Sequence, residues 1–390
     1  MRHAEANVSL RVLPRGEGLE RFLPEWRLLA ATALEPNPFY EPALLLPALQ
    51  SLRGDAAVDI VLVLRDAAGA QPRLIGLYPL ERRSRYRGIP LVSYRLWKHL
   101  HCFLCTPLVA AADAGASLAG LFDGLRGASA ASLVELGFCA GDGPFAAALA
   151  ETLRARGNAS VVTDSHTRAL YRPARDVEHY LSEALPPRKR RELERLGRRL
   201  AEQGRLEVSE LGPDEDPRPW IEAFLELEAS GWKGRDGTAL ALDAAQRRFF
   251  EDGAAALAAE GRLWMLGLAL DGKWIALKCN FLAGRGGFAF KIAYDEKHAR
   301  CSPGVLLELE TLSRLHQRAE IAWMDSCAVE GHFMKNRLWI HRREITTRLV
   351  ATGGASGRLF VHALPVLQRV KRMLATRARI RSAASEDAET

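Results

Sequence analysis

The sequence predicts an α/β fold with a mixed sheet, built as two tandem lobes with a basic helix between them. Segments typical of strands alternate with helical segments, and both halves of the chain repeat one order of hairpin, loop, helix and strand. An arginine-rich stretch separates the halves. The length of 390 residues also exceeds the usual size of one domain.

The first half opens with a predicted hairpin, because two apolar runs flank a turn-forming segment. A further apolar run, a helix, a strand, a second helix and a short strand follow it. In chain order, these segments are 59–65, 73–80, 106–110, a helical stretch ending near Leu125, 132–138, 144–156 and 160–163.

The second half repeats this order around the turn Asp271-Gly272, a strong signal for a two-residue hairpin. Its helix has apolar residues at helical spacing from Leu306 to Leu315. In chain order, the expected segments are a helix at 220–229, strands at 263–270, 273–282 and 287–293, a loop at 294–303, the helix from Gly304, and strands at 321–324 and 343–350.

A connector at 171–176 and a helix from Pro187 to about Gln203 lie between the halves. The helix is rich in arginine, so its polar face is either simply solvated or contacts an anionic partner. The expected division is an N-terminal lobe at 1–170, a C-terminal lobe at 171–355, and a basic helix with a disordered tail at 356–390.

Composition narrows the class of protein. No stretch approaches the roughly 20 uninterrupted apolar residues that a spanning helix needs, and residues 1–15 lack the order of a secretory signal. The six cysteines are scattered, without the spacing of a disulfide framework. We therefore expect a cytoplasmic protein with reduced thiols. The net charge of +7 suits nucleic acid, anionic lipid or a phosphorylated ligand.

The segment 291–308 is the most informative about function. In it a strand runs into a loop and then into a helix opened by Ser302, Pro303 and Gly304. A helix start leaves backbone N–H groups unpaired and carries partial positive charge, so it can bind phosphate. Gly304 allows close approach to the backbone, and Arg300 can pair with phosphate oxygens. The alternative is that Ser302 is an ordinary N-cap and Pro303 an ordinary first-turn residue.

From Trp232 to Trp339 the sequence resembles the GNAT acyltransferases, in a branch found beside bacterial cellulose and exopolysaccharide genes. The resemblance implies that the loop before the central helix binds the pyrophosphate of acetyl-CoA or another acyl-CoA. Ser-Pro-Gly replaces the glycine spacing of the family pattern. The matching pieces are Gly231-Trp232-Lys233-Gly234-Arg235, Asp271-Gly272, Lys291-Ile292-Ala293-Tyr294-Asp295, Ser302-Pro303-Gly304 and Asp325, and the cofactor-binding residues implied are Arg300, Ser302, Gly304 and Val305.

In such enzymes the acceptor attacks the thioester directly, so the protein must orient both substrates, accept a proton and stabilise an oxyanion. The expected proton acceptor is Asp325, placed at a strand end facing the cleft, or His332. Lys335 or Lys291 is expected to balance charge on the ligand. The alternatives are structural: Asp325 caps the next turn, and His332 is a hydrogen-bonded surface residue.

Further residues are expected to contact substrate. Trp232 lies between glycines and either lines an acceptor pocket or anchors the core at a helix end. Lys278 and Asn280 share one side of a strand and either point into the cleft or face solvent. The expected substrate-binding residues are Trp232, Lys233, Lys278, Asn280, Lys291 and Tyr294.

The function expected is transfer of an acetyl or other acyl group to an amine or hydroxyl of a small-molecule or saccharide acceptor, without a nucleic-acid partner. One alternative is an enzyme like the Fem-type peptidoglycan aminoacyltransferases, with the helix at 188–205 lying along aminoacyl-tRNA. Another is a non-catalytic scaffold of an exopolysaccharide assembly. The group His99, His101, Cys102 and Cys105 lacks a second ligand pair, so no metal site is expected.

Overall fold

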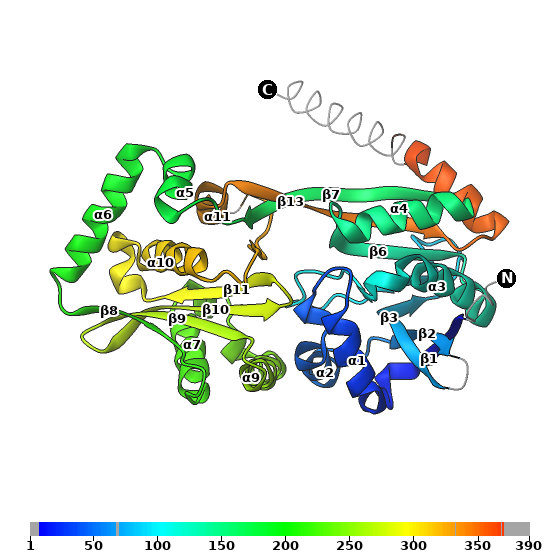
Figure 1. Cartoon of the computed structure of the whole chain (residues 1–390), viewed down its shortest axis with the longest axis horizontal. Helices are drawn as coiled ribbons and strands as arrows, with labels where there is room; N and C mark the ends of the chain where they lie inside the picture. Colours follow the sequence, from blue (N-terminus) through cyan, green and yellow to red (C-terminus); the bar gives the residue numbers. More distant parts are fainter. Residues whose placement is uncertain (1–7, 68–69, 332, 368, 370–390) are drawn as a thin grey trace, which may run out of the picture.

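One mixed sheet runs the length of the molecule (Figure 1). The structure, a computed structural model, describes residues 8–67, 70–331, 333–367 and 369. Within these residues thirteen strands join in the order β1-β2-β3-β4-β6-β13-β7-β12-β11-β10-β9-β8, with β5 paired to β3. They are β1 (Val8–Leu13), β2 (Val58–Ala67), β3 (Ala70–Arg83), β4 (Ser93–Leu96), β5 (Leu108–Val109), β6 (Leu133–Ala140), β7 (Ser160–Tyr171), β8 (Leu206–Glu210), β9 (Leu263–Leu270), β10 (Lys273–Ala283), β11 (Gly286–Tyr294), β12 (Trp323–Asp325) and β13 (His341–Ala351).

Helices cover both faces of the sheet. In the second lobe, α10 lies on one face and α7 and α9 lie on the other (Figure 1). The helices are α1 (Leu23–Ala31), α2 (Pro42–Ser51), α3 (Ala114–Ser129), α4 (Pro144–Arg156), α5 (Val177–Ala184), α6 (Pro187–Ala201), α7 (Arg218–Ser230), α8 (Trp232–Arg235), α9 (Ala244–Ala259), α10 (Pro303–Gln317) and α11 (Phe333–Leu338). The described helices are all too short or too polar to form a transmembrane span.

The two lobes share one topology. In the first, the meander β2-β3-β4 leads through α3 to β6, which pairs with β4 in parallel. In the second, the meander β9-β10-β11 leads through α10 to β12, which pairs with β11 in parallel. A parallel pair requires a crossover connection, which here contains a helix in each lobe. The predicted α/β fold with a mixed sheet and two tandem lobes is therefore confirmed.

The last strands of the two lobes are exchanged. β13 follows the helices of the second lobe, yet it lies between β6 and β7 and pairs with both. β7 closes the first lobe in sequence but pairs on its other edge with β12. Residues 341–351 thus belong to the expected C-terminal lobe at 171–355 but pair with strands of the expected N-terminal lobe at 1–170.

Turn and cap residues explain several boundaries. Asp271 and Gly272 both have positive φ, as a two-residue hairpin turn requires, and the predicted strands on either side are β9 and β10. Proline opens α4, α6 and α10 at the first helical position. Gly157 ends α4 in the left-handed conformation.

Other segments differ from the expectation. β7 extends through Tyr171, so part of the expected connector is strand. Residues 355–367 are helical, as predicted for the start of the C-terminal helix, whereas 370–390 lie outside the described residues.

The lobes also share a hydrophobic core. The Phe39 ring from the first lobe packs edge-on against Phe281 and Phe288 of the second, with ring centroids 6.4 and 6.0 Å apart. One continuous cluster of buried side chains includes residues of both lobes. Because of this core and the strand exchange, neither lobe is complete by itself.

Replacing Leu349 in β13 by alanine should therefore destabilise the whole chain. Leu349 is fully buried, and such a truncation costs roughly 2–5 kcal/mol. Guanidinium unfolding should show one transition whose midpoint falls equally by tryptophan fluorescence and far-UV circular dichroism. Val208→Ala, on the exposed edge strand β8, is the control and should change stability little. Separate transitions for the two probes would contradict this expectation.

Candidate active site at the start of α10

A cavity of about 440 Å³ opens beside the start of α10. β11, the segment after β12 and α8 form its walls, and Phe103 contributes from the first lobe. Nine of the predicted site residues line it: Trp232, Lys233, Lys278, Lys291, Tyr294, Ser302, Gly304, Val305 and Lys335. The fold therefore brings most of the predicted site residues together around one cavity.

Residues 302–305, at the start of α10, line this cavity. Ser302 adopts a left-handed conformation, and within the described residues its side chain caps no helix amide. Its carbonyl instead accepts the N–H groups of Val305 and Leu306, at 2.9 and 3.1 Å. The expectation of an ordinary Ser302 N-cap is thus wrong. Since Pro303 has no N–H, Gly304 supplies the first N–H of the helix, at its positive end.

Glu228 on α7 holds two of the cavity lysines. Its Oε1 lies 2.8 Å from Lys233 Nζ and 3.1 Å from Lys291 Nζ, and its Oε2 accepts the Leu240 N–H at 2.9 Å. Burial opposes ionisation of Glu228, but Lys291 and Lys233 outweigh it and lower the pKa of the carboxyl. Burial also lowers the pKa of Lys291, against the attraction of Glu228.

Glu308 on α10 holds the other two lysines. Its Oε2 lies 2.9 Å from Lys278 Nζ and 2.8 Å from Lys335 Nζ, and its Oε1 accepts the Trp339 indole N–H at 2.9 Å. Burial opposes ionisation of Glu308, but Lys278 and Lys335 outweigh it and lower its pKa to about 2. Burial dominates at Lys278 and lowers its pKa to about 7.

These clusters give the cavity wall a positive character. Four of its described lining residues are lysines, and none of the described lining residues carries a carboxylate. Glu228 and Glu308 stand behind the amines. Together with the positive end of α10, this arrangement suits an anionic ligand.

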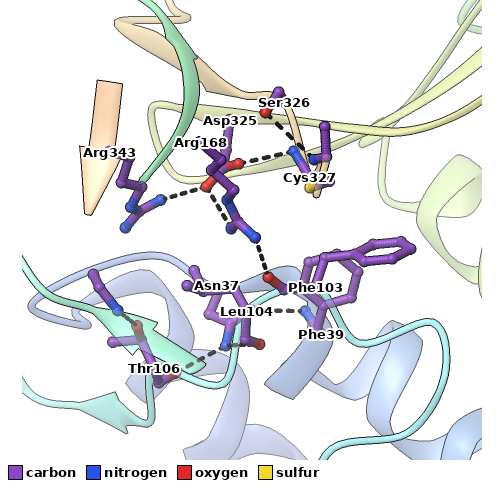
Figure 2. Close-up of polar contacts among 12 residues, drawn as sticks. Asn37, Phe39, Phe103, Leu104, Thr106, Arg168, Asp325, Ser326, Cys327 and Arg343 are labelled. Carbon is purple, nitrogen blue, oxygen red and sulfur yellow. Dashed lines mark hydrogen bonds and ion pairs between the residues drawn. The ribbon is translucent and has the colours of Figure 1, made fainter. Parts of the chain in front are cut away.

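Asp325 does not face the cavity. It is fully buried, and its Oδ2 lies 2.7 Å from Arg168 Nη2 and 3.0 Å from Arg343 Nη1 (Figure 2). Burial opposes its ionisation, but the two arginines outweigh it and lower its pKa. The expectation that Asp325 faces the cleft is therefore wrong, because its carboxylate is enclosed by Arg168 of the adjacent strand β7 and by Arg343 of β13, the next strand along the sheet.

The Asp325 network nevertheless shapes the cavity wall. Its Oδ1 accepts the Cys327 N–H at 2.9 Å, and Ser326 and Cys327 both line the cavity. Arg168 also donates to the Phe103 carbonyl at 2.5 Å, which ties the first-lobe wall residue to the same centre (Figure 2).

The remaining predicted residues lie elsewhere. Asn280 is fully buried and donates to the Trp264 carbonyl at 3.1 Å, so it faces neither cavity nor solvent. Arg300 is exposed and lies outside the cavity lining. His332 lies outside the described residues. Trp232 is 47% exposed and lines the cavity, so its alternative role as a core anchor is wrong.

Sequence reasoning missed the two carboxylates. Glu308 lies on the buried stripe of α10 with Thr311 and Leu315, and Glu228 lies on that of α7 with Phe224. A glutamate on the apolar face of a helix is a usable signal, since a buried carboxylate needs a cationic partner.

Within the described residues, the start of α3, the corresponding helix of the first lobe, is arranged differently. There Asp113 precedes α3 and is buried, with Arg65 Nη1 2.7 Å from its Oδ1 and Arg73 on its other oxygen. The Asp113 carboxylate therefore lies at the start of α3, paired with these two arginines.

Asp325→Asn should lower stability at pH 7 by about 3–5 kcal/mol, because it leaves two buried guanidinium groups short of a counter-charge. The folded pKa of Asp325 is lowered, so its contribution is present above its unfolded pKa of ~3.9 and is lost as pH falls through the folded value. Urea unfolding across this range measures the effect. Asp164→Asn, with a 66% exposed side chain, is the control. Unchanged stability with lost turnover would restore Asp325 as a catalytic base.

Known proteins resemble this chain in part of its sequence and in its fold. Residues 187–333, less than half of the chain, match the acetyltransferase (GNAT) domain family. No curated protein sequence matches. FemX shares 11% identity over 84% of this chain and 95% of its own, with a TM-score of 0.58. The C-terminal domain of a protein assigned as a lysylphosphatidylglycerol synthetase from Agrobacterium fabrum shares 15% over 89% and 97%, with a TM-score of 0.50. These structures share the fold, and the GNAT acetyltransferase domain at 187–333 supports an enzyme of the transferase class.

Proposed function

We propose that this protein transfers an acyl group from acetyl-CoA or another acyl-CoA to an amine or hydroxyl of a small-molecule or saccharide acceptor. The observation that supports this most is the start of α10, which opens into a cavity lined by four lysines. A diphosphate suits such a site, since the N–H of Gly304 at the positive end of α10 and nearby ammonium groups both favour negative charge. Gly304 is the backbone donor assigned to it, whereas Val305 lines the same cavity with its N–H already bonded to the Ser302 carbonyl.

The edge of β11 supports the same assignment. β11 pairs with β12 only from Gly286 to Phe288, and within the described residues it continues to Tyr294 without a strand on that edge. This open edge borders the cavity. Its backbone groups can pair with an extended ligand that carries amides, such as the pantetheine arm of CoA.

Other cavity residues receive roles from their positions. Trp232 and Tyr294 offer apolar surface, and Lys233 and Lys291 offer positive charge, to the substrates. Exposed Arg300 precedes Ser302 and is assigned to phosphate oxygens at the rim. The saccharide acceptor follows from the resemblance to the exopolysaccharide-associated branch.

Gly304→Glu should weaken acetyl-CoA binding more than tenfold, a loss of at least about 1.4 kcal/mol, by adding bulk and a carboxylate at the phosphate position. A Cβ at 304 would approach Tyr294 and Ile292 no closer than 3.5 Å, so the backbone tolerates a side chain. Gly115→Glu, at the same position of α3, is the matched control and should leave binding unchanged. Isothermal titration calorimetry measures both.

Absence of acetyl-CoA binding by the unmodified chain would contradict the proposal and favour the scaffold alternative.

Aminoacyl-tRNA is a second candidate donor, and α6 is the observation that favours it. Its exposed arginines include Arg191, Arg195 and Arg198. α6 also packs against the short helix Glu296–Cys301, which leads into α10. A polyanion on α6 would thus lie near the cavity.

Under the acyl-CoA proposal, replacing Arg191, Arg195 and Arg198 together by glutamine should leave acetyl-CoA affinity unchanged, because these side chains lie outside the cavity lining. Filter binding with tRNA tests the rival donor. Tight tRNA binding that weakens steeply with salt, with a shallower salt slope in the triple variant, would replace acyl-CoA by aminoacyl-tRNA.

A further inference from the structure

The cluster of Lys278, Glu308 and Lys335 contains two amines and only one carboxylate. Both amine nitrogens contact the same oxygen, Glu308 Oε2. The side chains are almost withdrawn from water, with residues 278, 308 and 335 exposed by 1%, 0% and 5%. If both lysines were protonated, a net positive charge would be buried here, at considerable cost in free energy. Loss of one proton from the pair removes that charge.

Within the described residues, Glu308 is the carboxylate that forms an ion pair with Lys278. β10 pairs on one side with β11 and on the other with β9, where the residues opposite Lys278 are Ile292 and Leu266. From α5, Tyr180 is influenced by the charge of Glu308, but burial raises its pKa to about 12 and keeps the phenol neutral. Glu308 from α10 and Lys335 from α11 are therefore the charged groups that set the state of Lys278.

Geometry decides which amine gives up its proton. Lys335 Nζ lies 4.2 Å from the centroid of the Trp339 ring, whereas Lys278 Nζ lies 5.8 Å from it. A cation close to an indole face is stabilised, so positive charge is held better on Lys335. Lys278 is also the more deeply buried of the two. Its depressed pKa, caused first by burial, agrees with this choice.

We propose that Lys278, kept uncharged by its shared contact with Glu308 and Lys335, is the residue that accepts a proton from the attacking group of the acceptor. This inference rests on the proposed acyl transfer. Lys278 lines the cavity, which places it beside the space where the acceptor is proposed to bind. An uncharged amine whose pKa lies near neutrality is well matched to general base catalysis.

For an amine acceptor, proton transfer to Lys278 precedes acyl transfer. Lys278 Nζ takes one proton from the acceptor ammonium, and the freed lone pair attacks the thioester carbonyl carbon to form the C–N bond. As the C–S bond breaks, the thiolate leaves with the second proton from that nitrogen. Lys278 then returns its proton to water in the cavity. For a hydroxyl acceptor, the O–H proton passes to Lys278 as the C–O bond forms.

The test is a pH titration of the full-length chain by NMR, with ¹³C at lysine Cε. The Lys278 signal is identified by its disappearance in Lys278→Arg. The expected midpoint lies near pH 7, whereas exposed lysines titrate near their ordinary value of ~10.4. A wild-type Lys278 midpoint near that ordinary value would overturn the inference.

A matched pair of variants separates charge from packing. The ammonium of Lys335 lowers the pKa of Lys278. Lys335→Met removes that ammonium, so the Lys278 midpoint should rise by about one pH unit or more. Lys335→Arg keeps the charge and should leave the midpoint near that of the wild type. Equal midpoints in Lys335→Met and the wild type would contradict the assigned cause.

Turnover distinguishes this inference from the proposed function. Thiol release from acetyl-CoA, with a panel of aminosugars as acceptors, should rise with pH at the Lys278 midpoint and shift with it in Lys335→Met. A rate that is independent of pH across that midpoint would overturn the inference alone. Failure of acetyl-CoA to bind in calorimetry would overturn the proposed function, whatever the titration of Lys278.

Discussion

The buried ion network around Asp325 is the interaction on which the rest of the structure depends. Its three members come from the three strands at the junction of the lobes, with Arg168 on β7, Asp325 on β12 and Arg343 on β13. Arg343 also reaches Glu35 of the first lobe at 3.0 Å. Charges withdrawn from water tolerate little displacement, because each partner must stay within contact of the others. The network therefore fixes the register at which the lobes join.

The junction of the lobes forms part of the cavity wall. The backbone that follows Asp325 forms one wall, and Phe103, held through Arg168, belongs to the other lobe. Elsewhere in the wall, Glu228 and Glu308 each hold the amines of two lysines that line the cavity. The first lobe contrasts with this pattern, since a carboxylate with its own arginines lies at the start of α3. The four cavity lysines, and with them the proposed ligand site, thus lie in the second half of the chain.

Local pattern predicted much of the fold. The turn Asp271-Gly272, the first-turn prolines and the apolar periodicity of α10 all depend on short-range chemistry, and each appears where expected. The exchange of β7 and β13 was not predictable in this way, because a strand's own residues do not specify which neighbour it pairs with. Asp325 shows the same limit. Its position after a short strand was read correctly, but the arginines that enclose it come from 157 and 18 residues away.

The sheet has a further consequence for how the chain arose and how it can vary. Its strand order has a pseudo-twofold relation about the contact between β7 and β13, each half carrying an edge strand, a meander, a parallel strand and a borrowed final strand. This is the arrangement of a strand-swapped dimer joined into a single polypeptide. In a single polypeptide the two lobes can differ in sequence, so the helix start of one lobe can lose a ligand site while that of the other keeps it. Substitutions that would disable both sites of a homodimer then affect only one.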